Sequence, residues 1–248
     1  MRFLRSLGIW VVTIVSTVVF GALAVPLALL PGGAESFRRL SVGWSALILR
    51  ASGVKVRVLH PERLPGGGSF VIASNHESFY DVAVLFTSLP MPLRFLAKRN
   101  LFRVPFLGWS MAAAGFVPVD RRDGSHGKEV LGAALRRLEG GRSLVIFPEQ
   151  TRTRTGELSP FKSGAAVFAI KAGLPLLPVG ISGTHRVHPR GNFHVTPGPV
   201  VVAIGNPIDV AGKSTRDRAA LTESLREAIA GLRDEARDAG IRSDGGER

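Results

Sequence analysis

The residue pair best suited to chemistry in this sequence is a histidine followed five positions later by an aspartate. His76 and Asp81 come directly after Ser69–Ala73, a short apolar run typical of a buried strand. A carboxylate that accepts a hydrogen bond from one imidazole nitrogen leaves the other nitrogen available as a base. Two plainer interpretations compete with catalysis. Ser78 and Asp81 have the spacing of a helix capping box, and His76 could be an ordinary loop histidine.

A second polar loop follows the apolar run Ser143–Phe147. It contains Glu149, Arg152 and Arg154. Ligands of α/β sheets bind beyond the carboxyl ends of the strands, and a guanidinium group can hold two phosphate oxygens at once. The loop is therefore a candidate phosphate site, although a solvated basic turn would have the same composition.

Four blocks within residues 70–181 resemble, in order, those of the glycerolipid acyltransferases, and specifically the 1-acylglycerol-3-phosphate acyltransferase family. A further similar segment, Leu96–Leu101 with Pro105–Trp109, lies between the first two blocks. The four blocks are Asn75-His76 with Asp81, Gly115-Phe116-Val117-Pro118-Val119-Asp120-Arg121, Phe147-Pro148-Glu149 with Thr151-Arg152, and Leu177-Pro178-Val179-Gly180.

This resemblance implies transfer of a fatty acyl group from acyl-CoA or acyl carrier protein to the free hydroxyl of a lyso-glycerophospholipid. The default acceptor is 1-acylglycerol-3-phosphate (lysophosphatidic acid), which would give phosphatidic acid. Other lyso-lipid acceptors fit the same blocks. Two rival functions are a thioesterase, in which water replaces the acceptor, and a non-catalytic, membrane-anchored basic protein that binds lipid.

The same resemblance implies a role for each site residue. His76 would take the proton of the acceptor hydroxyl, and Asp81 would orient the imidazole. Glu149 would order the third-block loop, and backbone N–H groups near Val179 and Gly180 would meet the oxyanion. The residues expected to hold the acceptor phosphate are Lys98, Arg121 and Arg152, with Arg154 a weaker candidate.

No cofactor or metal ion is expected. His185 and His188 have a spacing that metal ligands can show, but no third ligand is evident nearby. One position departs from the family pattern: the third block usually has glycine where this chain has Gln150. If that position takes a positive φ, the glutamine carries a backbone penalty on the order of 1 kcal/mol. The departure puts substrate preference in doubt more than phosphate binding.

Apolar runs alternate with segments of helical spacing after about residue 53, which predicts a mixed, largely parallel sheet flanked by helices. The final helix is expected over Ser214–Asp238, with a short disordered tail, Ser243–Arg248. The expected strands are Val54–Leu59, Ser69–Ala73, Leu93–Ala97, Phe116–Val119, Ser143–Phe147, Leu176–Ile181 and Val200–Ile204, and the other expected helices are Phe79–Leu89, Lys128–Glu139 and Ala165–Ala172.

The first 52 residues are expected to form a membrane-anchoring helical segment, and residues 53–248 the acyltransferase domain. Ser6–Ala34 has no charged residue and is long enough to cross a bilayer. A spanning anchor, a hairpin broken at Pro26 and turned at Pro31-Gly32-Gly33, and a cleaved signal all remain open. Ser36–Ser52 is either an interfacial amphipathic helix or a core helix. We expect attachment at the cytoplasmic face of the cell membrane.

Composition narrows the possible partners. The 248 residues carry a formal charge of +13, which favours an anionic partner. Aromatic residues make up only 7% of the chain, too few for a stacking platform, so nucleic acid is not expected as a partner. The chain has no cysteine, which excludes disulfides, thiolate metal sites and a cysteine nucleophile.

Overall fold

Seven strands form one mixed sheet in the part of the chain that the computed structural model describes, residues 1–120, 127–138 and 141–245. The strand order is β1-β7-β6-β2-β5-β3-β4. Strands β6 and β7 pair antiparallel, and the other neighbouring pairs are parallel. The strands are β1 (Val54–Leu59), β2 (Val71–Ser74), β3 (Leu93–Lys98), β4 (Val117–Val119), β5 (Ser143–Ile146), β6 (Leu176–Ser182) and β7 (Gly198–Ile204).

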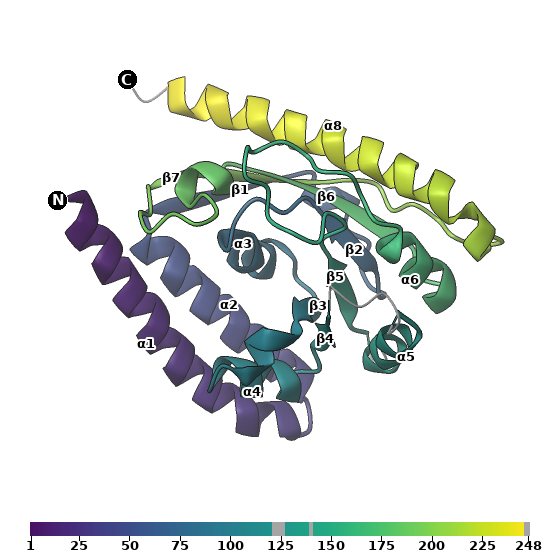
Figure 1. Cartoon of the computed structure of the whole chain (residues 1–248), viewed down its shortest axis with the longest axis horizontal. Coiled ribbons are helices and arrows are strands. Elements are labelled where there is room, and N and C mark those ends of the chain that lie inside the picture. Colours follow the sequence, from purple (N-terminus) through teal and green to yellow (C-terminus); the bar gives the residue numbers. More distant parts are fainter. Residues whose placement is uncertain (121–126, 139–140, 246–248) are drawn as a thin grey trace.

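Helices cover both faces of the sheet, with α8 across one face and α1, α2 and α3 on the opposite side (Figure 1). The α-helices are α1 (Arg2–Leu29), α2 (Gly33–Ala51), α3 (Tyr80–Ser88), α4 (Leu107–Ala113), α5 (Gly127–Arg137), α6 (Gly164–Ala172), α7 (Thr184–Val187) and α8 (Arg218–Gly245). Short 3-10 helices are η1 (Pro61–Arg63), η2 (Arg99–Arg103) and η4 (Thr215–Asp217).

The central strands are apolar on both sides because both faces are covered. In β2, Val71 and Ala73 pack with the cluster that includes α6 and α8, whereas Ile72 packs with the cluster that includes α2 and α3. Successive strand residues point to opposite faces, so a short run of small and branched apolar residues fills two cores at once. The predicted fold class and all seven expected strands are confirmed, with ends that differ by no more than two residues.

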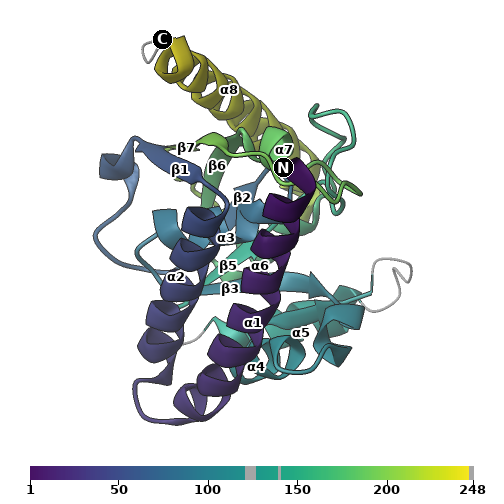
Figure 2. The ribbon, with the colours of Figure 1, turned by 90° about the vertical axis from the view of Figure 1, so that its left-hand side faces the viewer.

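Helices α1 and α2 form a hairpin that packs on the same side of the sheet as α3, where the two lie side by side (Figure 2). Gly32 turns the chain between them with φ +76°. Pro26 does not break α1, which continues to Leu29; that part of the sequence prediction is wrong. The ring removes only one amide donor from a helix that ends one turn later, so the terminal turn survives its loss.

The hairpin shares a hydrophobic core with the rest of the chain. Ile9 and Ala24 of α1 and Phe37 and Ile48 of α2 belong to the same buried cluster as β2 and β6. Most of the other face of α1 is exposed and apolar, and its span Arg2–Ala28 is long and apolar enough to cross a membrane, with a mean hydropathy of 2.3. Helix α2 therefore acts as a core helix at its buried face.

The C-terminal helix is longer than its amphipathic pattern predicts. Leu221, Leu225, Ile229 and Leu232 are buried against the sheet and α6, as expected. Helix α8 continues to Gly245, so the expected disordered tail is helical over residues 243–245. Residues 246–248 lie outside the described part of the chain.

Candidate active site

The histidine–aspartate pair lies where β2 ends and α3 begins. His76 Nδ1 is 2.8 Å from Asp81 Oδ2, and that oxygen also accepts hydrogen bonds from the backbone N–H groups of Glu77 (2.7 Å) and Ser78 (2.9 Å). Thr184, at the start of α7, donates to Asp81 Oδ1 at 2.5 Å. The bond from Ser78 is half of the predicted capping box, so Asp81 serves both the helix and the imidazole. Because the Asp81 carboxylate accepts a hydrogen bond from Nδ1–H, Nε2 is the ring nitrogen available to a substrate.

The imidazole ring is held between the aspartate and an aromatic ring. Phe147, the first residue after β5, stacks on His76 with the ring centroids 3.9 Å apart and the planes 13° apart. The side chain of His76 is 13% exposed. Strand β5 is the parallel neighbour of β2, so the carboxyl ends of the two strands bring these rings together.

Two further side chains fix the backbone of the loop. Asn75 makes a reciprocal pair with the backbone of Ile181 in β6, donating to its carbonyl and accepting from its N–H, both at 2.8 Å. Glu149 accepts from the backbone N–H of His76 and of Ser159, again at 2.8 Å each. The carboxylate of Glu149 therefore ties the first block to the third, and the amide of Asn75 ties the first block to the residue that follows the fourth block in β6.

Burial shifts the pKa of two carboxyl groups around the loop. It raises the pKa of Glu149, and the hydrogen bonds from Ser159 and His76 oppose that rise. It also raises the pKa of Glu77 to about 8, with the negative charge of Asp81 as the second cause. Glu77 accepts hydrogen bonds from Asn75 and from the N-terminus of α7.

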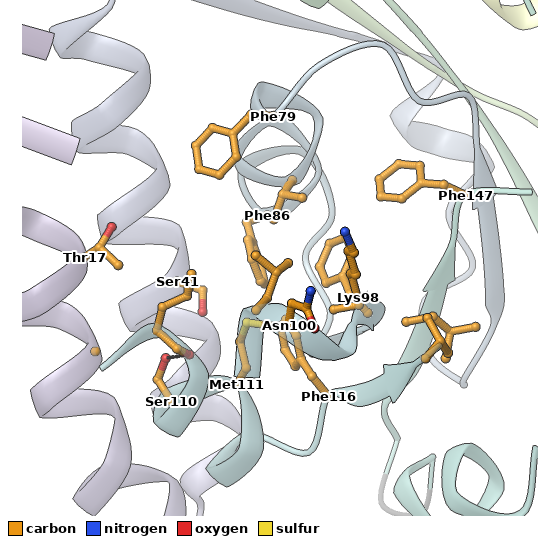
Figure 3. A pocket seen from close by; sticks show the side chains of 18 of the residues that line it. Thr17, Ser41, Phe79, Phe86, Lys98, Asn100, Ser110, Met111, Phe116 and Phe147 are labelled. Atoms are coloured by element: carbon orange, nitrogen blue, oxygen red, sulfur yellow. Dashed lines mark hydrogen bonds between the residues drawn. The ribbon is translucent and has the colours of Figure 1, made fainter. Parts of the chain in front are cut away.

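A cavity of about 740 Å³ begins at His76 and extends between the sheet and the helical hairpin. Figure 3 shows Phe79, Phe86, Met111 and Phe116 around it, with Lys98 and Asn100 among them. Most of its wall is apolar and comes from α1, α2, α3, β3 and α4. Its polar lining is Thr17, Ser41, His76, Lys98, Arg99, Asn100, Ser110, Asp120, Thr151, Arg152 and Arg190.

The cavity brings together some of the predicted phosphate ligands. Lys98, at the end of β3, and Arg152 both line it with His76. Arg154 is exposed and is not among the lining residues, and Arg121 lies outside the described residues. Burial lowers the pKa of the Arg152 guanidinium, with the charge of Arg190 as the next cause, but an arginine remains a cation throughout the physiological range.

The expected oxyanion donors near Val179 and Gly180 are in the wrong place. Both residues lie inside β6, which runs on to Ser182, and their backbones face Ser74 of β2 and Ala203 of β7. A Cβ built on Gly180 would come within 2.5 Å of the α8 backbone. The glycine of the fourth block is therefore needed for close packing of a helix on the sheet.

Gln150 has a positive φ, which meets the condition for the backbone penalty considered above. Its φ is +62°, and its N–H donates to Phe147 O at 2.9 Å. Its side chain is exposed and does not line the cavity. The loop thus keeps a conformation suited to glycine while carrying a glutamine, with Glu149 and Arg152 on either side of it.

His185 and His188, whose spacing metal ligands can show, do not form a metal site with other residues in the described part of the chain. His188 is buried, its Nε2 lies 2.8 Å from Asn192 O, and burial lowers its pKa. Within the described ranges, no group of three or more His, Cys, Asp or Glu side chains is arranged to hold a metal ion.

Several residues of the site were not predicted from the sequence. Thr184 was missed because it reaches Asp81 through the pairing of β6 with β2, and the sequence does not show which strands are neighbours. The stacking of Phe147 on His76 depends on side-chain rotamers that the sequence does not show. Arg190 and the contribution of α1 to the cavity depend on how distant segments pack, and no local pattern marks them.

Comparison with known proteins places these features in context. Residues 55–182 match the acyltransferase family. The chain is 37% identical over 149 residues to the chloroplast 1-acyl-sn-glycerol-3-phosphate acyltransferase BAT2 of Brassica napus, covering 59% of this chain but only 43% of that protein. It is 31% identical to the 1-acyl-sn-glycerol-3-phosphate acyltransferase of Haemophilus influenzae, covering 74% of this chain and 78% of that one.

A solved structure shows the same fold. The 1-acyl-sn-glycerophosphate acyltransferase of Thermotoga maritima superposes with a TM-score of 0.81 at 24% identity. The match covers 96% of this chain and 95% of that one, so it includes the α1–α2 hairpin as well as the sheet.

Proposed function

Because this chain belongs to the acyltransferase family, we propose that it transfers a fatty acyl group from a thioester donor to the free hydroxyl of 1-acylglycerol-3-phosphate. The donor is acyl-CoA or acyl carrier protein, and the product is phosphatidic acid. Relatives that share 31% to 37% identity carry names for that reaction. The observation that carries the proposal is one largely apolar cavity whose polar lining includes His76, Lys98 and Arg152.

In the proposed mechanism His76 is the general base. Its Nε2 takes the proton of the acceptor hydroxyl as the oxygen attacks the thioester carbonyl carbon. The C–S bond then breaks, and the imidazolium returns the proton to the departing thiolate. General-base help of this kind contributes roughly 10²–10⁴ in rate. Asp81 Oδ2 lies 2.8 Å from Nδ1, accepts its hydrogen bond and stabilises the imidazolium. Because the acceptor hydroxyl attacks the thioester directly, no acyl-enzyme is required.

The acceptor phosphate is assigned to the basic side chains of the cavity. Lys98 and Arg152 line it beside His76, and a guanidinium fork suits the oxygens of a phosphate. Arg121 stays a candidate on the resemblance alone. Glu149 is a positioning residue in this proposal, because its carboxylate binds the backbone N–H of His76 and not a group in the cavity.

We place the protein on a membrane, with the catalytic domain at the cytoplasmic face. One side of α1 lines the cavity with Thr17, Phe20, Gly21 and Ala24. The other side exposes large apolar residues, among them Leu7, Val11, Ile14, Val15, Val18, Val19 and Leu23. An acceptor with a long acyl chain stays in the bilayer, and a helix with such a face binds at the boundary between headgroups and acyl chains.

Purified full-length protein, vesicles and labelled acyl-CoA test the proposal. We expect labelled phosphatidic acid from 1-acylglycerol-3-phosphate and none from His76→Ala, whose fold and vesicle binding should be retained. Release of labelled free fatty acid without a diacylated lipid would indicate a thioesterase. Absence of both products with every lyso-acceptor and with acyl carrier protein as donor would leave only a lipid-binding role. A His76→Ala variant with more than a few per cent of the rate would refute the assignment of the base.

A further inference from the structure

We propose that Arg190 is a second guanidinium ligand of the acceptor phosphate, and that its pairing with Arg152 selects acceptors whose phosphate is a monoester. The inference rests on the proposed function, because it names the acceptor class for the same cavity. Arg190 lies after β6 and α7, outside all four sequence blocks, and nothing in its local sequence marks it as a ligand.

The two guanidinium groups belong to the same part of the cavity. Arg190 lines it together with His76, Thr151 and Arg152. Its NH1 donates to the backbone carbonyl of Arg152 at 3.2 Å. Burial is the main cause of the lowered pKa of Arg152; the charge of Arg190 lowers that pKa further, and the charge of Asp81 opposes the shift. Within the described ranges, neither guanidinium forms an ion pair with a carboxylate.

The charge of the two arginines argues for a doubly charged ligand. Two neighbouring positive charges without an ion-pair partner destabilise the empty site, although Asp81 offsets part of the repulsion at Arg152 and solvent screens the exposed Arg190. An anion between them reverses the sign of that interaction. A phosphate monoester carries about two negative charges near neutral pH, as a phosphorylated side chain does, whereas a phosphodiester carries one. The pair therefore favours the monoester over the diester form of an otherwise identical lyso-lipid.

The loop that carries Arg190 is fixed at several points. Val195 N–H donates to Ser6 Oγ at 3.1 Å, and Arg5 donates to Val195 O at 2.8 Å. Trp10 Nε1 donates to Phe193 O at 2.9 Å. These three bonds come from the first turns of α1, so the N-terminal helix holds one end of the loop.

The other end of the loop is tied to the histidine loop. Ser78 Oγ donates to His188 O at 2.8 Å. Ser78 follows His76 by two residues, and His188 precedes Arg190 by two residues. The backbone at Arg190 therefore lies between α1 and the segment that carries the base. A side chain on a backbone held in this way has less freedom to lose when it binds a ligand.

The experiment compares Arg190→Ala and Arg190→Lys with wild type on two acceptors with the same acyl chain and a free 2-hydroxyl. One is 1-acylglycerol-3-phosphate, a monoester, and the other is 1-acyl-lysophosphatidylglycerol, a diester. We expect Arg190→Ala to lower kcat/KM for the monoester about 10- to 100-fold, the usual effect of a lost charged hydrogen bond. The donor KM should not change, the diester should lose less than threefold, and lysine should restore part of the loss. Arg216→Ala removes the same charge from exposed η4 and should match wild type.

Binding gives a readout that does not need turnover. In a His76→Ala background, Arg190→Ala should weaken binding of 1-acylglycerol-3-phosphate in detergent micelles by the same 10- to 100-fold. If binding and kcat/KM both stay within twofold, or if only the donor KM rises, the assignment of Arg190 is overturned. Equal losses with monoester and diester overturn the selectivity. A wild-type protein that binds the monoester through Arg190 but transfers no acyl group would refute the proposed function and leave this inference standing.

Discussion

Replacing Gln150 with glycine should make the protein more stable. Gln150 has φ +62°, and an L-residue in the left-handed region pays roughly 1–2 kcal/mol relative to the right-handed one. Glycine escapes that cost but loses more backbone freedom on folding, about 0.5–1 kcal/mol. The exposed glutamine side chain contributes little packing to lose. The net gain is therefore about 0.7 kcal/mol, or about 2 °C in Tm for a chain of this length.

Thermal unfolding of wild type, Gln150→Gly and Gln150→Ala in one detergent measures this difference. Alanine is the matched control, because it removes the same exposed side chain but keeps the Cβ that makes the left-handed conformation costly. Gln150→Ala should be no more stable than wild type, and kcat/KM should stay within about twofold for the glycine variant. A glycine variant less stable than wild type, or an alanine variant as stable as the glycine one, would refute the backbone argument.

Three more predictions concern the site. Asp81→Asn should fold but lose about 10³-fold or more in kcat at unchanged donor KM, because the imidazole loses its orienting carboxylate; steady-state kinetics that retain a tenth of the rate would contradict this. The neutral form of Glu77 stabilises the folded state, since its pKa rises from 4.5 to about 8 on folding. That stability is present below about pH 4.5 and is lost as the pH rises through 8, so Glu77→Gln should flatten the decline of Tm between pH 5 and pH 8, and an unchanged slope would exclude Glu77 as its source. Arg152→Ala should raise the acceptor KM with little change in donor KM, whereas an effect on the donor alone would place Arg152 at the phosphates of the carrier.

Much of the sheet could be predicted because the strands are short segments rich in apolar, often branched residues between polar turns. Ser143–Ile146 is a nearly continuous apolar run, and in Val54–Leu59 valines alternate with Lys55 and Arg57. The order of the strands could not be predicted, because both faces of the sheet are covered and the runs carry no register signal. Helix α4 was missed because Gly108 sits inside a short apolar stretch without helical periodicity. Its start also depends on Phe106, which takes a φ of +62°.

The site was predictable only where its residues follow one another along the chain. His76 and Asp81 share a single loop, and their 2.8 Å contact agrees with the spacing argument. Asn75 was part of a recognised block, yet its two bonds to Ile181 connect positions more than one hundred residues apart. The oxyanion prediction failed because Val179 and Gly180 lie between two neighbouring strands, β2 and β7. The sequence places both residues in a strand but does not show which strands lie on either side of it.

Four hydrogen bonds to the carboxylate of Asp81 give this residue a structural role that His76 does not share, so the two positions should be under different selection. Three come from groups that would need satisfying even in an inactive protein: the N–H groups of Glu77 and Ser78 and the hydroxyl of Thr184. The His76 side chain, in contrast, forms a hydrogen bond with Asp81 and stacks on Phe147. A lineage that gave up acyl transfer could exchange the histidine at little cost in folding while selection for foldedness kept the aspartate. Among related sequences, a retained aspartate therefore indicates that the loop still folds. The histidine five positions before it is the better indicator of acyltransferase activity.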